Sequence, residues 1–285
     1  SSGGILLAEI LNTLENANIN TLGHNSSASM HLWIETEKQA YADRAKHLGD
    51  IDFYDSPFEL LITKKYGQTI FQSINPYYAR SSEVVKPAHV ESMETTHYSV
   101  VDSEGNTVST TYTINGFYGS GVIVEGTGIL MNNEMDDFVI KPGFPNMFGL
   151  VGGEANAIEP GKRMLSSMTP TIVVKDDKTF MTAGSPGGSV IITSVAQVLS
   201  NVIDFKMNIR EAVEAPRFHH QWLPNIVKYE KFGFSNDVLT NLRMKGHHLK
   251  EVIDLGNVQA ILWDEENSEW TAWSDPRRNG TSKGY

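Results

Sequence analysis

The side chains that could do chemistry here are hydroxyls, carboxylates and imidazoles, because the 285 residues include no cysteine. This excludes a cysteine nucleophile, a thiolate zinc site and a disulfide framework. His219 and His220 are adjacent, so their side chains project differently, and no third ligand follows at metal-site spacing. We therefore expect neither a metal nor a cofactor. The acidic run Glu134, Asp136 and Asp137 is by itself typical of a solvated loop.

The elements that position these residues fall into two regions. Apolar residues recur at helical spacing in residues 5–14 and 30–48, which predicts two helices. Between residues 54 and 94 the pattern weakens into segments punctuated by proline. Within that stretch, residues 81–87 are typical of an exposed connector.

Strand-like alternation begins at Tyr98. Residues 98–114 alternate apolar and hydroxyl side chains around a turn signal at 103–106, which predicts a half-buried hairpin. Two further hairpins are expected to turn at 176–178 and 265–268. A long amphipathic helix is expected to follow Gly187, Gly188 and Ser189. The sequence therefore predicts a mixed α and β fold with paired antiparallel strands.

Composition limits the class of protein. A chain of 285 residues, 40% of them hydrophobic, can bury a sizeable core. The net charge of −11 argues against a nucleic-acid partner. The longest apolar stretch, residues 190–205, is interrupted by polar residues and cannot cross a membrane. The chain starts with Ser1 and has no leader pattern, so we expect a removed or truncated N-terminal part.

Five segments, in order along the chain, resemble motifs of the gamma-glutamyltransferase (gamma-glutamyl transpeptidase) family of bacterial type. They are residues 95–100, 132–138, 165–168, 184–189 and 216–222. The resemblance runs from Thr95 to the C-terminus and implies that residues 95–285 are the small catalytic subunit. Residues 1–94, which include Arg44, resemble the C-terminal part of the large subunit. The implied fold is the α+β four-layer αββα sandwich of N-terminal-nucleophile hydrolases, incomplete because the N-terminal part of the large subunit is absent.

The resemblance implies that the precursor cuts itself between Glu94 and Thr95. Thr95 then becomes a new N-terminus and the catalytic nucleophile. A free α-amine, with a pKa of about 7.7 to 8.0, can act as base for the threonine hydroxyl near neutral pH. By itself Thr95 is an ordinary strand-edge threonine, and only the family match gives it this role.

Further site residues follow from the same resemblance. Thr113 matches a threonine that orients the nucleophile, although it also lies in a Thr-rich strand where packing alone explains it. Gly187 and Gly188 match the oxyanion hole, where unpaired N–H groups before a helix can hold a negative oxygen. By itself, a Gly-Gly pair before a helix is usually just a turn.

The donor substrate carries an α-ammonium and an α-carboxylate, which need acceptors and donors respectively. The family match places Asn115, Glu134 and Asp137 around the ammonium. It places the hydroxyls of Ser166 and Ser167 at the carboxylate.

Three departures from the family pattern bear on this site. Val190 occupies a place where bacterial relatives often have arginine. In the lid over the donor pocket, Phe148 replaces a tyrosine whose hydroxyl bonds to the residue matching Asn115. The family's carboxylate-binding arginine belongs to the part of the large subunit that this chain lacks.

The implied activity is cleavage of gamma-glutamyl amides, glutathione among them, through a gamma-glutamyl ester on Thr95. Water or an acceptor amino acid or peptide then resolves the ester, and the residues leave the balance open. The implied partner is the N-terminal part of the large subunit, and the implied location is periplasmic or extracellular. Two alternatives stay open: a cephalosporin-acylase-like amidase, and a truncated relative without catalysis.

Overall fold

The computed structural model describes residues 2–82 and 95–284. Its N-terminal part is helical, with α1 (Gly3–Leu14) packed on α3 (Ser27–His47). Both predicted helices are therefore confirmed. α1 buries Leu6, Ile10 and Leu14, which lie on one face. α3 begins where the Ser26 hydroxyl accepts a hydrogen bond from the Ser29 N–H at 3.1 Å.

Three shorter helices complete this part: α2 (Ile19–Leu22), α4 (Phe58–Leu61) and α5 (Lys64–Ser73). The weak pattern after residue 54 did not predict α5. Its N-cap is Thr63, and its buried residues are Gly67 and Ile70. Gly67 lies so close to α1 that a Cβ there would be 2.4 Å from the Asn12 carbonyl oxygen. Most of the predicted connector at 81–87 lies outside the described residues.

A four-stranded antiparallel sheet forms the centre, in the order β11-β10-β6-β5. Its strands are β5 (Thr171–Lys175), β6 (Lys178–Gly184), β10 (Gln259–Asp264) and β11 (Glu269–Ser274). Both predicted hairpins are confirmed. The first turns through Asp176 and Asp177, both at positive φ, as a two-residue hairpin loop requires.

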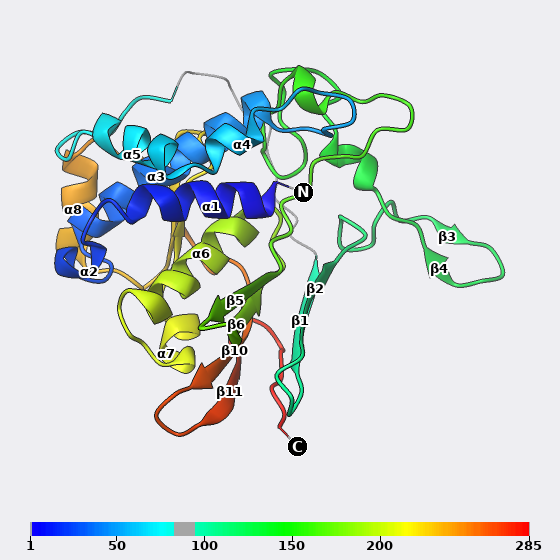
Figure 1. The fold of residues 1–285 in the computed structure, drawn as a ribbon. Helices are drawn as coiled ribbons and strands as arrows, with labels where there is room; N and C mark the ends of the chain where they lie inside the picture. Colours follow the sequence, from blue (N-terminus) through cyan, green and yellow to red (C-terminus); the bar gives the residue numbers. More distant parts are fainter. Residues whose placement is uncertain (1, 83–94, 285) are drawn as a thin grey trace.

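The sheet lies between two layers (Figure 1). On one side are α6 (Val190–Ile203) and α7 (Ile209–Glu214), with α1 and α3 beyond them. On the other side is the hairpin of β1 (Thr96–Val101) and β2 (Thr107–Tyr112). α6 begins directly after the glycine turn, as predicted, and almost every residue in it is buried. The α+β fold class is confirmed.

The predicted half-buried hairpin is confirmed as β1–β2, and the structure shows which of its faces is covered. Its hydroxyl face packs on the sheet, where the Ser99 and Thr182 hydroxyls lie 3.3 Å apart. Its apolar face is open among the described residues: Val100 is 46% exposed and Tyr112 is 60% exposed. Alternation identified the two faces correctly but not which one is covered.

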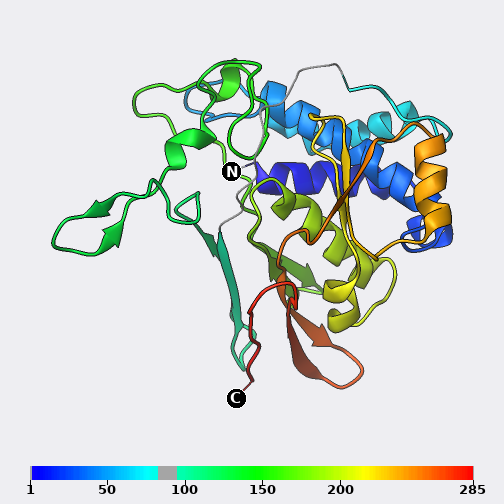
Figure 2. The same cartoon turned by 180° about the vertical axis from the view of Figure 1, so that it is seen from behind.

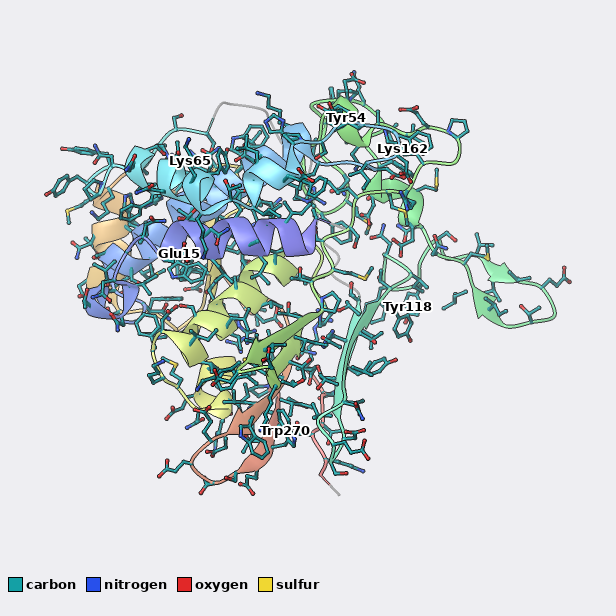
Figure 3. The ribbon with its side chains drawn as sticks, in the orientation of Figure 1. Glu15, Tyr54, Lys65, Tyr118, Lys162 and Trp270 are labelled. Atoms are coloured by element: carbon teal, nitrogen blue, oxygen red, sulfur yellow. The ribbon has the colours of Figure 1, made fainter. Side chains whose placement is uncertain are left out.

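The remaining elements lie at the periphery. A hairpin of β3 (Ile123–Val124) and β4 (Ile129–Leu130) projects from the body, with Tyr118 near its base (Figures 1 and 3). Two short 3-10 helices follow, η1 (Glu134–Asp137) and η2 (Glu154–Asn156). A small sheet, β7 (Phe218–His219), β8 (Val227–Glu230) and β9 (Leu249–Val252), lies behind with α8 (Asn236–Met244), as Figure 2 shows. In the described ranges, no helix is long and apolar enough to cross a membrane.

A buried carboxyl pair joins the first helices and makes stability depend on pH. Burial, and then the neighbouring Asp43 charge, raise the pKa of Glu9 to about 9. Asp43 accepts hydrogen bonds from Gln39 at 3.0 Å and from the Tyr66 hydroxyl at 2.8 Å. Glu9 therefore stays protonated in the folded state at neutral pH.

We predict that the free energy of unfolding falls as pH rises between about 4.5 and 9, because the unfolded chain loses the Glu9 proton first. One such proton contributes at most about 1.4 kcal/mol per pH unit. Glu9→Gln should remove this slope, as measured by urea unfolding at several pH values. An unchanged slope in the variant would contradict the assignment.

Candidate active site

Strand pairing brings the predicted nucleophile and its partner together. Thr96 pairs with Tyr112, so Thr95 and Thr113 lie opposite each other just beyond the ladder. The Thr95 hydroxyl donates to the Thr113 hydroxyl oxygen at a long 3.5 Å. The Thr113 oxygen also accepts from the Asn115 backbone N–H at 2.8 Å. The structure thus places three predicted residues at one end of the hairpin.

Asn115 is held by a residue that the sequence analysis did not single out. Its backbone is left-handed, with φ 71°, and its side chain is buried. Its amide donates to the Asn133 carbonyl at 3.1 Å, while the Asn133 side-chain oxygen accepts from the Gly116 N–H at 2.7 Å. Asn133 lies inside the matched segment 132–138, but nothing local pointed to this role.

The Gly187–Gly188 turn connects β6 to α6 in a conformation that side chains disfavour. Gly187 has φ 135° and Gly188 has φ 53°. The Phe148 ring lies directly over Gly188, where a Cβ would be 2.5 Å from Phe148 Cδ1. Val190, one of the departures from the family pattern, is fully buried, and a Cβ on Gly187 would be 2.7 Å from its methyl group.

His97 anchors the hairpin that carries Thr95. Its ring nitrogens contact the Thr111 hydroxyl at 2.7 Å and the Ser99 hydroxyl at 3.1 Å. The ring lies against Gly184 of β6, where a Cβ would be 2.1 Å from His97 Cε1. Burial lowers the pKa of His97 to about 4, so the imidazole is neutral at physiological pH.

Two of the predicted donor-binding residues, Asp137 and Ser167, lie near Arg44 of α3. Burial raises the pKa of Asp137 to about 7, and the Arg44 charge opposes this shift. Burial also raises the pKa of Glu134. Arg44 donates to the Ser167 hydroxyl at 3.3 Å. The Ser166 hydroxyl accepts from the Met168 N–H at 3.1 Å.

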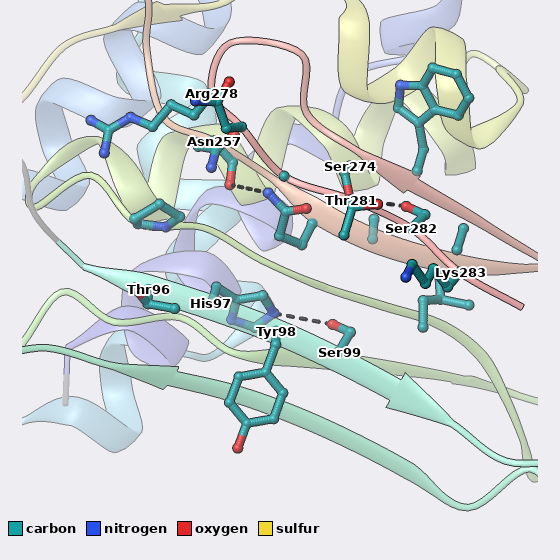
Figure 4. Close-up of a pocket in the computed structure, with 18 of the residues that line it drawn as sticks. Thr96, His97, Tyr98, Ser99, Asn257, Ser274, Arg278, Thr281, Ser282 and Lys283 are labelled. Atoms are coloured by element: carbon teal, nitrogen blue, oxygen red, sulfur yellow. Dashed lines mark hydrogen bonds between the residues drawn. The ribbon is translucent and has the colours of Figure 1, made fainter.

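A cavity of about 430 Å³ opens beside Thr95, between β1 and the C-terminal segment (Figure 4). Its wall includes His97, Asn257, Gln259 and Arg278. Among the described residues, its lining includes none of the predicted ammonium or carboxylate contacts, which are Asn115, Glu134, Asp137, Ser166 and Ser167. The sequence analysis missed this wall, since no motif pointed to residues 257–283.

The two adjacent histidines have structural partners. His219 contacts the Thr193 hydroxyl at 2.9 Å and the Gln221 side-chain oxygen at 3.0 Å. The His220 Nε2 atom contacts the side-chain oxygen of Asn225 at 3.2 Å. Within the part of the chain that is described, no group of three or more acidic or histidine side chains is placed to hold a metal.

Comparison with known proteins identifies structures with a similar fold. The chain resembles the crystal structure of a Bacillus halodurans cephalosporin acylase with a TM-score of 0.83 at 26% identity, covering 99% of this chain and 50% of that one. A mutant gamma-glutamyltranspeptidase of Helicobacter pylori gives a TM-score of 0.62 at 57% identity, covering 64% and 100%. The Pseudomonas nitroreducens gamma-glutamyltranspeptidase, solved with L-DON, gives a TM-score of 0.64 at 47% identity. The match covers 67% of this chain and 99% of that one. These neighbours share the fold class of N-terminal-nucleophile hydrolases.

The whole chain, residues 1–285, matches the family described as Gamma-glutamyltranspeptidase, and the chain belongs to this family. It is 50% identical over 280 residues to the glutathione hydrolase proenzyme of Escherichia coli, covering 97% of this chain and 48% of that protein. It is 46% identical over 285 residues to the glutathione hydrolase proenzyme of Pseudomonas aeruginosa, and the match covers 98% of this chain and 51% of that protein. The chain therefore spans about half the length of the curated relatives it matches. The resemblance to the family is confirmed.

Protonation of His97 should loosen the hairpin. The pKa of His97 in the folded state lies below the unfolded value of 6.5. The stabilising contribution of the neutral His97 ring is therefore complete above pH 6.5 and is lost as pH falls toward 4. The loss is on the order of 3 kcal/mol. We expect His97→Gln to flatten this acid limb in thermal unfolding between pH 4 and 7. An equally steep limb in the variant would show that other groups cause it.

Gly188→Ala should lower the free energy of unfolding by about 1 to 2 kcal/mol for the left-handed backbone, and further by displacing Phe148. Gly4→Ala is the matched control, since a Cβ at this exposed helical glycine meets nothing within 4 Å. This control should raise the free energy of unfolding by about 0.5 to 1 kcal/mol. Chemical denaturation of both variants checks the contrast, and equal effects would refute the packing of Phe148 on Gly188.

Proposed function

We propose that this chain cleaves gamma-glutamyl amides, glutathione and related compounds, after self-cleavage between Glu94 and Thr95. The observation that carries the proposal is the Thr95 hydroxyl, 3.5 Å from Thr113 at the start of β1, in a chain that belongs to the gamma-glutamyltranspeptidase family. The curated relatives are named glutathione hydrolase proenzymes. Glu94 itself lies outside the described residues.

The reaction would proceed through an ester. The Thr95 Oγ1 attacks the gamma-carbonyl carbon while the free α-amine of Thr95 takes the hydroxyl proton. The tetrahedral oxygen is held by the N–H groups of Gly187 and Gly188, which precede helix α6. Collapse breaks the C–N bond, and the amine leaves with the proton. Water or an acceptor amine then attacks the ester and restores the Thr95 hydroxyl.

Recognition of the donor is assigned to two groups of residues. Asn115, Glu134 and Asp137 would face the α-ammonium, and the raised pKa of Asp137 fits a carboxyl that awaits a cation. Ser166 and Ser167 would bind the α-carboxylate. Arg44, which already donates to the Ser167 hydroxyl, orients that side chain.

We further propose that residues 1–94 and 95–285 are separate subunits after cleavage. Support comes from solved chains of relatives that align end to end with 64% and 67% of this chain, since residues 95–285 make up about two thirds of it. The open apolar face of hairpin β1–β2 supports a partner there, the N-terminal part of the large subunit. A periplasmic or extracellular location is part of the same proposal.

The test is the mass of the precursor under denaturing conditions, together with turnover of gamma-glutamyl-p-nitroanilide. Wild type should give two species, one beginning at Thr95. Thr95→Ala should remain one chain, with turnover reduced by about 10³ or more. Thr95→Ser should retain cleavage, because a serine supplies the same two groups.

The matched control is Thr96→Ala, which changes the neighbouring exposed threonine and should cut and turn over normally. A single uncut wild-type chain in a folded sample would favour the non-catalytic alternative. Turnover of an acyl-cephalosporin in place of the gamma-glutamyl substrate would favour the acylase alternative.

A further inference from the structure

The side chain of Gln221 touches three parts of the structure at once. It follows β7 and is only 4% exposed. Its oxygen accepts from the Ser189 hydroxyl at 2.8 Å and contacts His219 Nε2 at 3.0 Å. Its amide nitrogen donates to the Phe148 carbonyl at 3.2 Å. One amide therefore joins the backbone at Phe148 to the turn that opens α6.

We call residues 142–153 the lid segment. Within it, Phe148 contacts both the glycine turn and Gln221. The Phe148 ring covers Gly188, while its backbone carbonyl is the group that Gln221 holds. Gly149 comes next, at φ 70°, and a Cβ there would lie 3.2 Å from the Gln221 amide nitrogen. The backbone thus passes closely over Gln221, and a phenylalanine, which has no hydroxyl, is anchored through its carbonyl.

The orientation of the Gln221 amide follows from its neighbours. Burial lowers the pKa of His219 to about 4, so its ring is neutral and carries one N–H. The Phe148 carbonyl can only accept a hydrogen bond, so the Gln221 NH₂ group donates to it, and the His219 Nε2–H donates to the Gln221 oxygen. The Gln221 oxygen therefore faces His219 and Ser189, and its NH₂ group faces Phe148. A carboxylate in this place would set oxygen against oxygen at the Phe148 carbonyl.

The turn is held from a second side as well. The Tyr41 hydroxyl of α3 donates to the Ser189 carbonyl, and the Tyr41 ring stands edge-on to His219, with centroids 5.6 Å apart. Ser189 is thus fixed at its backbone by α3 and at its hydroxyl by Gln221. Loss of the Gln221 link would leave the turn in place and free the Phe148 carbonyl, while the Met147 N–H would keep its bond to Asp136 at 2.9 Å.

We propose that Gln221 is a positioning residue that holds Phe148 of the lid segment over the Gly187–Gly188 turn and so couples pocket closure to the geometry of that turn. The proposal rests on the proposed function for its kinetic consequence but not for its structural one. With the carbonyl free, the ring leaves Gly188 and the donor pocket stays open. Donor binding weakens, whereas the nucleophile on β1 is unaffected.

Hydrogen–deuterium exchange of the full chain tests the structural part. Gln221→Glu should speed exchange in residues 146–152 by about tenfold, because the bond that holds the Phe148 carbonyl is lost. Gln221→Met, which removes the donor without adding a charge, should do the same. The matched control is Gln197→Glu, another buried glutamine whose amide donates to a backbone carbonyl, that of Phe218, at 2.7 Å. It should lower Tm and leave the lid segment unchanged.

Kinetics test the functional part. In both Gln221 variants, KM for gamma-glutamyl-p-nitroanilide should rise about fivefold or more, while kcat per cleaved subunit changes less than twofold. Unchanged exchange and KM in both variants, with only a lower Tm, would reduce Gln221 to a packing residue. A wild-type chain with no turnover would defeat the proposed function, yet the exchange experiment would still decide whether Gln221 holds the lid.

Discussion

The structure depends on how hairpin β1–β2 is seated on the central sheet. The contact is polar: the Ser99 hydroxyl meets Thr182 of β6 and the Thr107 hydroxyl meets Thr179. The His97 ring packs against Gly184 of β6. Gly184 permits the approach, because any side chain there would displace the His97 ring. Buried polar contacts of this kind are costly unless satisfied, so they specify one position for the hairpin. The position of Thr95 follows from that seating.

The second constraint is the connection from β6 to α6. The strand ends, the chain turns through two glycines at positive φ, and the buried helix begins within six residues of Gly184. Phe148, Ser189 and Gln221 surround this turn, so lid and helix start are parts of one packed unit. In contrast, hairpin β1–β2 packs on the face of the sheet that is opposite α6. Thr95 and the Gly187–Gly188 turn thus belong to different layers.

Much of the local structure could be predicted from the sequence. The hairpins were found because Asp176, Asp177 and the 265–268 turn interrupt clear alternation. Helix α5 was missed because it is short and contains Gly67, a residue that weakens a helical pattern. Gly67 is needed there because α1 lies too close for a side chain. The covered face of β1–β2 could not be predicted, because alternation does not say which side packs on the sheet. The roles of Asn133 and Gln221 and the wall at 257–283 join distant segments, and no local pattern encodes them.

Hairpin β1–β2 is a two-stranded sheet that pairs with no other strand in the described chain. Each of its outer backbone edges can therefore accept a foreign strand, and its outward face is apolar. Unless another polypeptide covers this surface, the region that carries Thr95 is also prone to self-association. Solubility and the position of Thr95 are then linked through the same twelve paired residues. Selection against aggregation would favour prompt assembly of the hairpin with its cover during synthesis.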